Sequence, residues 1–521
     1  MTKLLVLGID GADFDILDPL FEQDRMPNLQ RLAENGAVGP LKSTIPPSTC
    51  PGWQSFYTGK SPGNIGIYGF RNFEWGSYET HIPDSSDLTE GTYWELLGDQ
   101  GIRTGIVGGP FTYPPQEIEG FMIGGPWTPS DAEEFTYPPA LSEELREVCD
   151  GEYVFIPDNY VEEEFTEAFD RRTEAATHLV ETQDWDVFTL VYRPDPLQHV
   201  YWDKDDEVVF RIYEYMDRCI GEVLDLVDEL EEDINVMVMS DHGFEGLRTR
   251  YFHVNQWLED EGYLTTTSDA STSAIKYLPL ETGLNIASKL GVLDFIKHHF
   301  VPHEVKEAVS NPLHTIKWSE TRAFFIWEQQ TGQIYVNTED RFAEGTVVPD
   351  RREEVAQDIR KQLRPITDPE GRDVIEESWL GSELYDGTYE EIAPDVVFTL
   401  HREYKGQGTF GDLFTTLDTD RAEGGHHVDG VFFASGPDFQ DGDVDDAEII
   451  DLAPTILHLM DAPVEEGMDG EVLTGVYADD SPVEDREIEY TKREGGERRT
   501  ANWEEDQKEE VEGRLEDLGY L

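Results

Sequence analysis

The stretch LLVLGID, residues Leu4–Asp10, decides the fold class. Leu4–Ile9 shows no polar alternation, which is typical of a strand buried on both faces of a parallel sheet. Similar runs recur along the chain, separated by helical patterns such as Val208–Leu230 and Ala453–Met460. These further runs are Arg103–Gly108, Val187–Tyr192, Ile234–Met239, Val396–Leu400 and Val431–Ala434. Alternating strands and helices predict an α/β fold with a mostly parallel central sheet.

Three of the predicted strands are followed by an aspartate: Asp10, Asp195 and Asp241. Open parallel sheets bind ligands beyond the carboxyl ends of their strands, so each of these acids is expected at that edge. A single aspartate there is often a loop or helix cap. Three together, two of them beside a histidine, favour a ligand site.

Histidines accompany two of these acids. Asp195 and His199 are four residues apart, so on a helical turn both side chains point the same way. Asp241 and His242 are adjacent and precede a glycine that permits a tight turn. Carboxylates and neutral imidazoles are standard zinc ligands. The pattern predicts a metal site.

Two further histidine pairs carry different expectations. His426 and His427 follow a Gly-Gly pair and offer more imidazoles to the predicted edge. His298 and His299 lie in an amphipathic run, where a solvated face is the simpler interpretation.

Thr49 precedes Cys50 and Pro51, and a proline is favoured in the first turn of a helix, here one that stops at Gly59. The N-terminus of a helix attracts anions through its free N–H groups and its dipole. A metal-activated hydroxyl at that position can act as a nucleophile. A simple helix cap is the competing interpretation.

The composition describes a folded protein with a very acidic surface. The 521 residues carry a formal charge of −72, yet 11% of them are aromatic, unlike disordered acidic chains. This charge argues against nucleic-acid binding as the main role and against docking on anionic membranes. The 13 Lys against 26 Arg, with 111 acids, are typical of proteins from organisms with molar cytoplasmic salt. A halophilic, haloarchaeal origin is expected.

Cysteine usage and hydropathy predict a cytoplasmic protein. Three cysteines without CxxC spacing form no disulfide framework. The apolar run at the N-terminus is shorter than the apolar region of a secretion signal, and no apolar run is long enough to span a membrane. The oligomeric state stays open.

Four regions are expected along the chain: residues 1–250 and 393–475 form the α/β core, 251–392 an inserted cap or subdomain, and 476–521 an acidic tail. In the tail, Val511, Leu515 and Leu518 share one helical face, which predicts a docked terminal helix.

The order of these motifs resembles the alkaline phosphatase superfamily, in particular its type I phosphodiesterase/nucleotide pyrophosphatase branch and predicted phosphohydrolase/phosphomutase relatives. The matching positions are Asp10, Thr49-x-Pro51, Asp195-x-x-x-His199, Asp241-His242-Gly243 and Gly424-x-His426-x-x-x-Gly430. Further similar blocks, such as RPDPLQHVYW, VMSDHGF and VDGVFFASGP, extend over most of the chain.

The resemblance implies a three-layer sandwich with an inserted cap. It also implies a centre of two divalent ions that hydrolyses a small-molecule phosphate ester, and the expected ester is a phosphodiester. One ion would be held by Asp195, His199 and His426. The other would be held by Asp10, Thr49, Asp241 and His242, with Thr49 forming a phospho-threonine intermediate. Zinc suits these ligands, with manganese or another divalent ion as alternatives.

Departures from the family pattern weaken a claim to nucleotide substrates. Phe70 stands where nucleotide-cleaving members carry an asparagine, Cys50 replaces an aromatic residue, and Ile65-Gly66-Ile67 replaces a His-Gly-Ile triplet. A sulfatase is disfavoured because threonine cannot become formylglycine and Trp53 occupies the arginine position of that motif. The alternatives are a phosphomutase or phosphotransferase using the same nucleophile, and a non-catalytic metal-binding relative.

Overall fold

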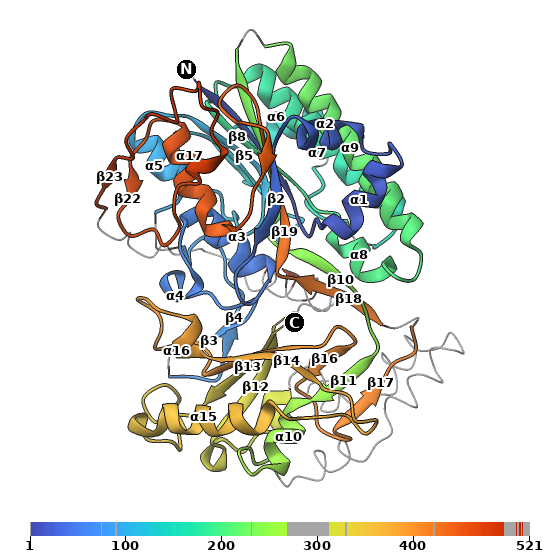
Figure 1. Cartoon of the computed structure of the whole chain (residues 1–521), viewed down its shortest axis with the longest axis vertical. Coiled ribbons are helices and arrows are strands. Elements are labelled where there is room, and N and C mark those ends of the chain that lie inside the picture. The colour runs from blue at the N-terminus through green and yellow to red at the C-terminus, as the bar shows by residue number, and fades with distance from the viewer. Residues whose placement is uncertain are drawn as a thin grey trace.

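The computed structural model describes residues 2–267 and 312–493, apart from 74–75, 89–90, 150, 152, 158, 231, 329–330 and 420–421, together with Gln507, Glu510, Val511 and Gly513. These residues form a larger and a smaller lobe (Figure 1). His298, His299, Leu515 and Leu518 lie outside the described residues.

A ten-stranded sheet forms the centre of the larger lobe, with the order β20-β2-β19-β9-β1-β8-β5-β6-β7 and β21 paired to β2. The strands are β1 (Lys3–Ile9), β2 (Gly36–Lys42), β5 (Thr104–Gly109), β6 (Gly120–Gly124), β7 (Thr136–Tyr137), β8 (Val187–Tyr192), β9 (Ile234–Met239), β19 (Asp429–Ser435), β20 (Gly442–Asp443) and β21 (Ala447–Glu448). Its middle strands β9, β1, β8, β5 and β6 are parallel. The predicted α/β fold with a mostly parallel sheet is confirmed.

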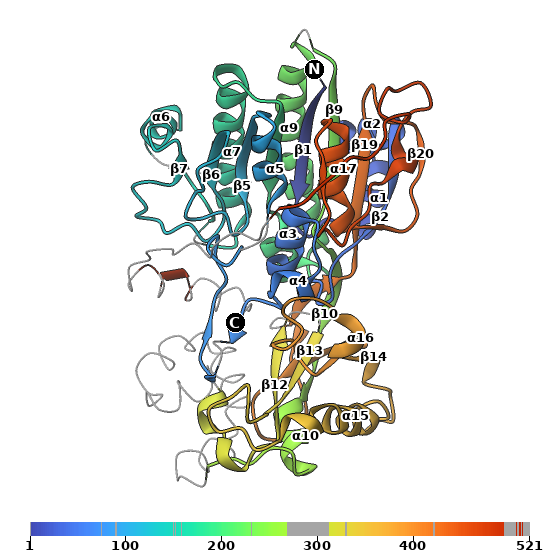
Figure 2. The same ribbon diagram turned by 90° about the vertical axis from the view of Figure 1, so that its left-hand side faces the viewer.

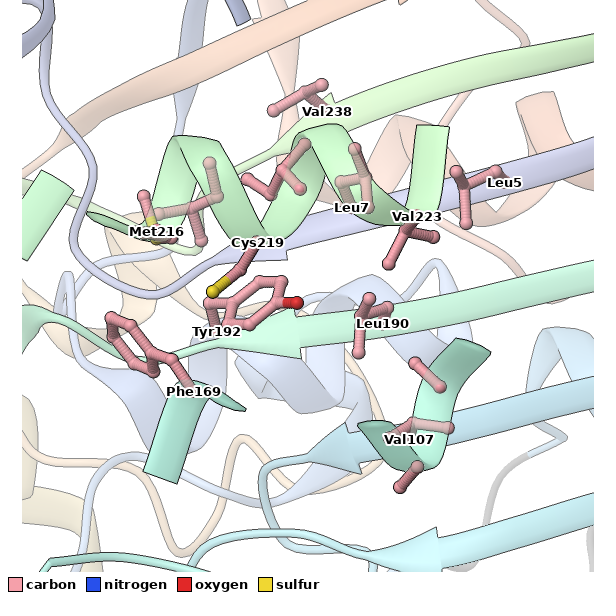
Figure 3. Packing of buried hydrophobic residues seen from close by; sticks show 14 of the residues in the cluster. Leu5, Leu7, Val107, Phe169, Leu190, Tyr192, Met216, Cys219, Val223 and Val238 are labelled. Carbon is pink, nitrogen blue, oxygen red and sulfur yellow. The ribbon is translucent and has the colours of Figure 1, made fainter. Parts of the chain in front are cut away.

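Helices cover both faces of this sheet, as the side view shows (Figure 2). On one face lie α1 (Phe14–Glu22), α2 (Pro27–Glu34), α6 (Leu141–Val148), α7 (Glu162–Thr182) and α9 (Asp206–Asp228). On the other lie α3 (Thr49–Thr58), α5 (Tyr93–Asp99) and α17 (Leu452–Leu459). Alternate residues of β1 enter the two apolar cores: Leu5 and Leu7 pack with α7 and α9 (Figure 3), and Leu4 and Val6 pack toward α3.

The smaller lobe comprises the elements between Arg250 and Thr416. Its main sheet is antiparallel, in the order β12 (Ala323–Glu328), β13 (Thr331–Val336), β15 (Val396–Leu400), β14 (Ile375–Leu380). A three-stranded sheet, β16 (Tyr404–Gln407), β11 (Arg250–His253) and β17 (Phe414–Thr416), lies beside it. The helices are α10 (Val254–Asp260), α15 (Arg352–Leu363) and α16 (Gly381–Leu384), and a separate apolar core joins the sheets and α15.

Short elements complete the described chain. A two-stranded antiparallel sheet of β10 (Gly243–Arg248) and β18 (Glu423–His427) lies between the lobes (Figure 1). The others are α4 (Pro62–Ile65), α8 (Asp195–Tyr201), β3 (Asn72–Phe73), β4 (Thr80–His81), β22 (Val464–Glu465), β23 (Tyr490–Thr491) and the 3-10 turns Pro312–Thr315, Trp318–Glu320, Pro349–Arg351, Ile449–Asp451 and Thr474–Val476. None of the described helices combines the length and apolarity needed to cross a bilayer.

Two predicted strands have other partners than expected. Val396–Leu400 pairs antiparallel in the smaller lobe, and Val431–Ala434 lies in β19, which runs antiparallel to β9 and β2. Both runs are apolar because both faces are covered, and that coverage does not depend on strand direction. The sheet that contains Val396–Leu400 therefore extends past residue 392, where the predicted insertion ends.

Candidate active site

The three predicted acids meet at one edge of the central sheet. Asp10, Asp195 and Asp241 follow the neighbouring parallel strands β1, β8 and β9, and the backbone N–H of Asp10 donates to the Tyr192 carbonyl oxygen at 3.0 Å. All three side chains are fully buried. The carboxyl ends of adjacent parallel strands lie side by side, so strand order alone brings Asp10 into one site with two acids that follow it by 185 and 231 positions.

Asp10, Asp241 and His242 form the tightest group of potential metal ligands. Among the described residues it is the one set of three whose ligand atoms all lie within 4.8 Å of one another. His242 Nε2 lies 3.2 Å from Asp241 Oδ2 and 3.7 Å from Asp10 Oδ1. The other oxygen of each acid is held by a donor: Gly11 N–H donates to Asp241 Oδ1 at 3.1 Å, and Trp53 Nε1 donates to Asp10 Oδ2 at 3.2 Å.

Gly11 owes its place here to its backbone conformation. Its φ of +71° lies in the left-handed region, where a side chain is strained, and an added Cβ would lie 3.0 Å from Asp195 Cβ. This turn directs the Gly11 N–H to Asp241 and its carbonyl oxygen to Gln198, whose Nε2 donates to it at 2.8 Å.

Thr49 is the first residue of α3, and Ser48, not Thr49, occupies the cap position. Thr49 is fully buried, and its Oγ1 lies 3.2 Å from His242 Nε2. The helix ends at Gly59 with φ +65°, as predicted. The interpretation of Thr49 as a simple N-cap is therefore wrong, because its hydroxyl faces the acid–histidine group instead of the first turn.

His199 of α8 and His426 of β18 form a second group. Their Nε2 atoms are 3.1 Å apart, and each Nδ1 faces a backbone carbonyl oxygen, Gly424 at 3.1 Å and Pro47 at 2.9 Å. The His426 ring stacks on His242 with ring centroids 3.6 Å apart. His427 lies on the opposite side of β18, where its Nδ1 accepts from the Asp429 N–H at 3.2 Å.

The hydrogen-bond pattern of the three imidazoles fits a cation. Each Nδ1 facing a carbonyl must carry the proton, so each Nε2 presents a lone pair. Two lone pairs 3.1 Å apart repel unless a proton or cation lies between them. In addition, Asp10 Oδ1 and Asp241 Oδ2 are buried without a hydrogen-bond partner among the described residues. These imidazole nitrogens and carboxylate oxygens are suitable ligands for a divalent ion such as zinc.

Burial sets the protonation states of the histidines. Loss of hydration lowers the pKa of His199 to about 3 and that of His242 to about 4, and it lowers the pKa of His426 well below its ordinary value. All three imidazoles are therefore neutral near pH 7, the form that binds metals.

The pKa values of the buried acids shift in the opposite direction, upward. Burial raises the pKa of Asp241 to about 8. Burial, followed by the charges of Asp195 and Asp241, raises the pKa of Asp10 well above its ordinary value. The raised pKa values favour protonated Asp10 and Asp241, and a bound metal ion would displace those protons.

Residues 4–428 match a family model described as type I phosphodiesterase / nucleotide pyrophosphatase. The chain belongs to this family. It is a family of phosphoric ester hydrolases, and the predicted membership is confirmed. A search of curated proteins finds no match.

Solved structures with the same fold include phosphonoacetate hydrolase from Sinorhizobium meliloti 1021. The complex with phosphonoformate has 18% identity and a TM-score of 0.56, and the complex with phosphonoacetate has 16% and 0.55. Each comparison covers 88% of this chain and 95% of the hydrolase. At this identity the likeness establishes a shared fold.

In this member of the family, two residues that depart from the family's sequence pattern have a structural role. Cys50 and Phe70 are fully buried and pack in one apolar cluster with Phe111 and Trp127, next to Thr49. Val511 of the predicted terminal helix joins the same cluster and is 2% exposed. One side of the proposed nucleophile is thus lined by buried apolar side chains.

Sequence reasoning missed two partners of the acids in this phosphodiesterase-family site. Trp53 donates to Asp10, and Arg193 forms ion pairs with both Asp195 and Asp10. Both residues lie beside predicted motifs: Arg193 precedes Pro194-Asp195, and Trp53 follows Pro51 by two residues. Their contacts with Asp10, however, join residues more than 40 positions apart and have no local pattern.

Proposed function

We propose that the chain hydrolyses a phosphodiester at a two-metal centre, with Thr49 as the nucleophile. The observation that carries the proposal is the position of the Thr49 hydroxyl, 3.2 Å from His242 Nε2 and at the start of α3, within a buried group of acids and imidazoles. Family membership supports hydrolysis of a phosphoric ester.

Asp10, Asp241 and His242 would hold one ion together with Thr49 Oγ1, and Asp195, His199 and His426 would hold the other. Two divalent ions lower the pKa of a bound hydroxyl and stabilise the attacking and leaving oxygens of an in-line displacement. Zinc is the proposed ion because carboxylates and imidazoles are its usual ligands. Manganese or another divalent ion is the alternative.

The residues of the chain bind and orient the ester. The N-terminus of α3 directs its free N–H groups and dipole toward an anionic phosphate beside Thr49. The Oγ1–phosphorus bond of Thr49 forms as the bond from phosphorus to the leaving alcohol breaks, and the proton lost by the Thr49 hydroxyl is balanced by the one that the leaving alcohol gains. Water then cleaves the phospho-threonine and restores the hydroxyl.

A substrate panel tests the proposal. The purified protein, with added Zn²⁺ or Mn²⁺, is assayed on an aryl phosphodiester, an aryl phosphomonoester, an aryl sulfate and phosphonoacetate. We expect the diester to react fastest. Faster hydrolysis of the monoester or of phosphonoacetate would contradict the diester assignment, and transfer to an added alcohol instead of water would indicate a phosphotransferase.

A pair of threonine variants tests the nucleophile. Thr49→Ala should abolish turnover, and Thr49→Ser should retain part of it because a hydroxyl remains. Thr58→Ala is the matched control: it removes a buried hydroxyl from the other end of α3, where Thr58 Oγ1 donates to the Gln54 carbonyl at 2.8 Å. Undiminished activity in Thr49→Ala would rule out Thr49 as the nucleophile.

A further inference from the structure

Arg193 is a buried cation that contacts an acid from each half of the proposed centre. Its side chain is 4% exposed. Nη2 donates a hydrogen bond to Asp195 Oδ2 at 3.1 Å, and Nε lies 3.1 Å from Asp195 Oδ1, so the guanidinium is close to both oxygens of that carboxylate and hydrogen-bonds to Oδ2. The same Nε lies 3.4 Å from Asp10 Oδ2. Arg193 therefore links the proposed ligand of one ion to a proposed ligand of the other.

Aromatic packing fixes the plane of this guanidinium. Arg193 lies over the Trp127 ring, 4.6 Å from its centroid. Trp127 in turn stacks on Phe111, with centroids 4.5 Å apart and planes inclined by 17°. Phe111 and Trp127 are both 3% exposed, so the stack has little freedom to move. A guanidinium held flat by a buried stack is a rigid template for carboxylates.

The arrangement leaves one oxygen of Asp10 facing away from Arg193. Asp10 Oδ2 faces Arg193 and Trp53, while Asp10 Oδ1 faces His242. Ligand carboxylates in metal sites are commonly oriented by such hydrogen-bond donors behind them. We propose that Arg193 is a positioning residue, which holds Asp10 and Asp195 in the orientation that binds the two ions. This inference rests on the proposed two-metal function.

Zn²⁺ titration of the metal-free full chain by calorimetry tests the inference. We expect Arg193→Gln to bind Zn²⁺ roughly 10- to 100-fold more weakly than the wild type, the usual loss when an outer partner of a ligand is removed. Arg193→Lys should lie between them, because a lysine keeps the charge but cannot pair with both oxygens of Asp195. If Arg193→Gln does not fold, Arg193→Lys decides.

Arg341→Lys is the matched control. Arg341 forms an equally buried ion pair with Asp395 in the smaller lobe, at 2.7 Å with both side chains 3% exposed. A merely structural role of Arg193 would lower the melting temperature in both lysine variants and leave Zn²⁺ affinity unchanged in both. Unchanged or tighter Zn²⁺ binding by the Arg193 variants overturns the positioning role. A wild type that binds no divalent ion overturns the proposed function itself.

Discussion

The two lobes contribute to the site in different ways. All proposed ligands and the nucleophile come from the larger lobe or from β18, and none comes from the elements between Arg250 and Thr416. The described contacts of the smaller lobe with the larger one include the segment that flanks α3. Tyr385 donates to the Ile45 carbonyl at 2.9 Å, and Gln333 donates to the Tyr68 carbonyl at 2.6 Å.

The two lobes thus have different roles: one supplies the proposed reactive groups and the other contacts the chain around them. The larger lobe places reactive groups by strand order, whereas the smaller lobe braces the chain before and after the helix that carries Thr49. Variants of the proposed ligands and nucleophile should therefore change metal binding and turnover, and variants of the smaller lobe should change stability with little effect on turnover.

The largest effect is expected from Asp241→Asn. The amide keeps the shape of the side chain but removes the negative ligand, so the loss of metal affinity should exceed the roughly 10- to 100-fold caused by changes of outer partners. Elemental analysis and turnover measure the result. Asp13→Asn is the control, since Asp13 is also buried near this edge but accepts from the Asp15 and Phe244 N–H groups. Wild-type metal content in Asp241→Asn would contradict the site.

Neighbouring histidines allow a second comparison within β18. His426→Gln should weaken metal binding and turnover by at least about 10-fold, because its Nε2 faces the site. His427→Gln should leave both unchanged, because His427 lies on the other side of the strand. Equal losses in the two variants would show that the assignment of His426, and not His427, as the metal ligand from β18 is wrong.

The pH dependence of stability should distinguish the metal-free from the metal-loaded protein. The pKa of Asp241 is raised from 3.8 to about 8 by burial, so the folded state holds a proton that the unfolded chain releases. Metal-free protein should be most stable below pH 4 with respect to this group and should lose that contribution as pH rises toward 8. Denaturant unfolding at several pH values measures it. With bound Zn²⁺ the trend should reverse, because the ion binds the ionised carboxylate.

The smallest effect is expected from Tyr385→Phe in the smaller lobe. It removes one hydrogen bond to Ile45, worth about 1 kcal/mol of unfolding free energy, and should change kcat by less than a few-fold. Tyr404→Phe is the control, since its hydroxyl donates to Asp368 at 2.7 Å within the smaller lobe alone. A kcat loss in Tyr385→Phe as large as that in Asp241→Asn would place the smaller lobe in the chemistry.

The two lobes also differ in how well the sequence predicts them. The apolar runs before Asp10, Asp195 and Asp241 are strands of the central sheet, because a strand covered on both faces leaves a continuous apolar pattern. That pattern reports coverage and not direction, so it misassigned Val396–Leu400, an antiparallel strand whose faces are equally covered.

Within the site, residues with a fixed local spacing were predictable, and residues that act through long-range contacts were not. Residues that come directly after strands, or that share a helical turn as Asp195 and His199 do, have fixed local spacing and were predicted. Arg193 and Trp53 act through contacts with Asp10, which is more than 40 residues away from either, and no local spacing encodes such contacts. The exclusion of a capping role for Thr49 likewise required the position of His242.

The hydrogen bond from Trp53 to Asp10 gives the protein an intrinsic optical probe. The indole N–H donates to Asp10 Oδ2 at 3.2 Å, while the other oxygen of that carboxylate faces the proposed ion. An ion that withdraws electron density from Asp10 weakens this hydrogen bond and alters the environment of a fully buried fluorophore. Tryptophan emission should therefore follow occupancy of the centre in real time without a label, and Trp53→Phe should remove that part of the response.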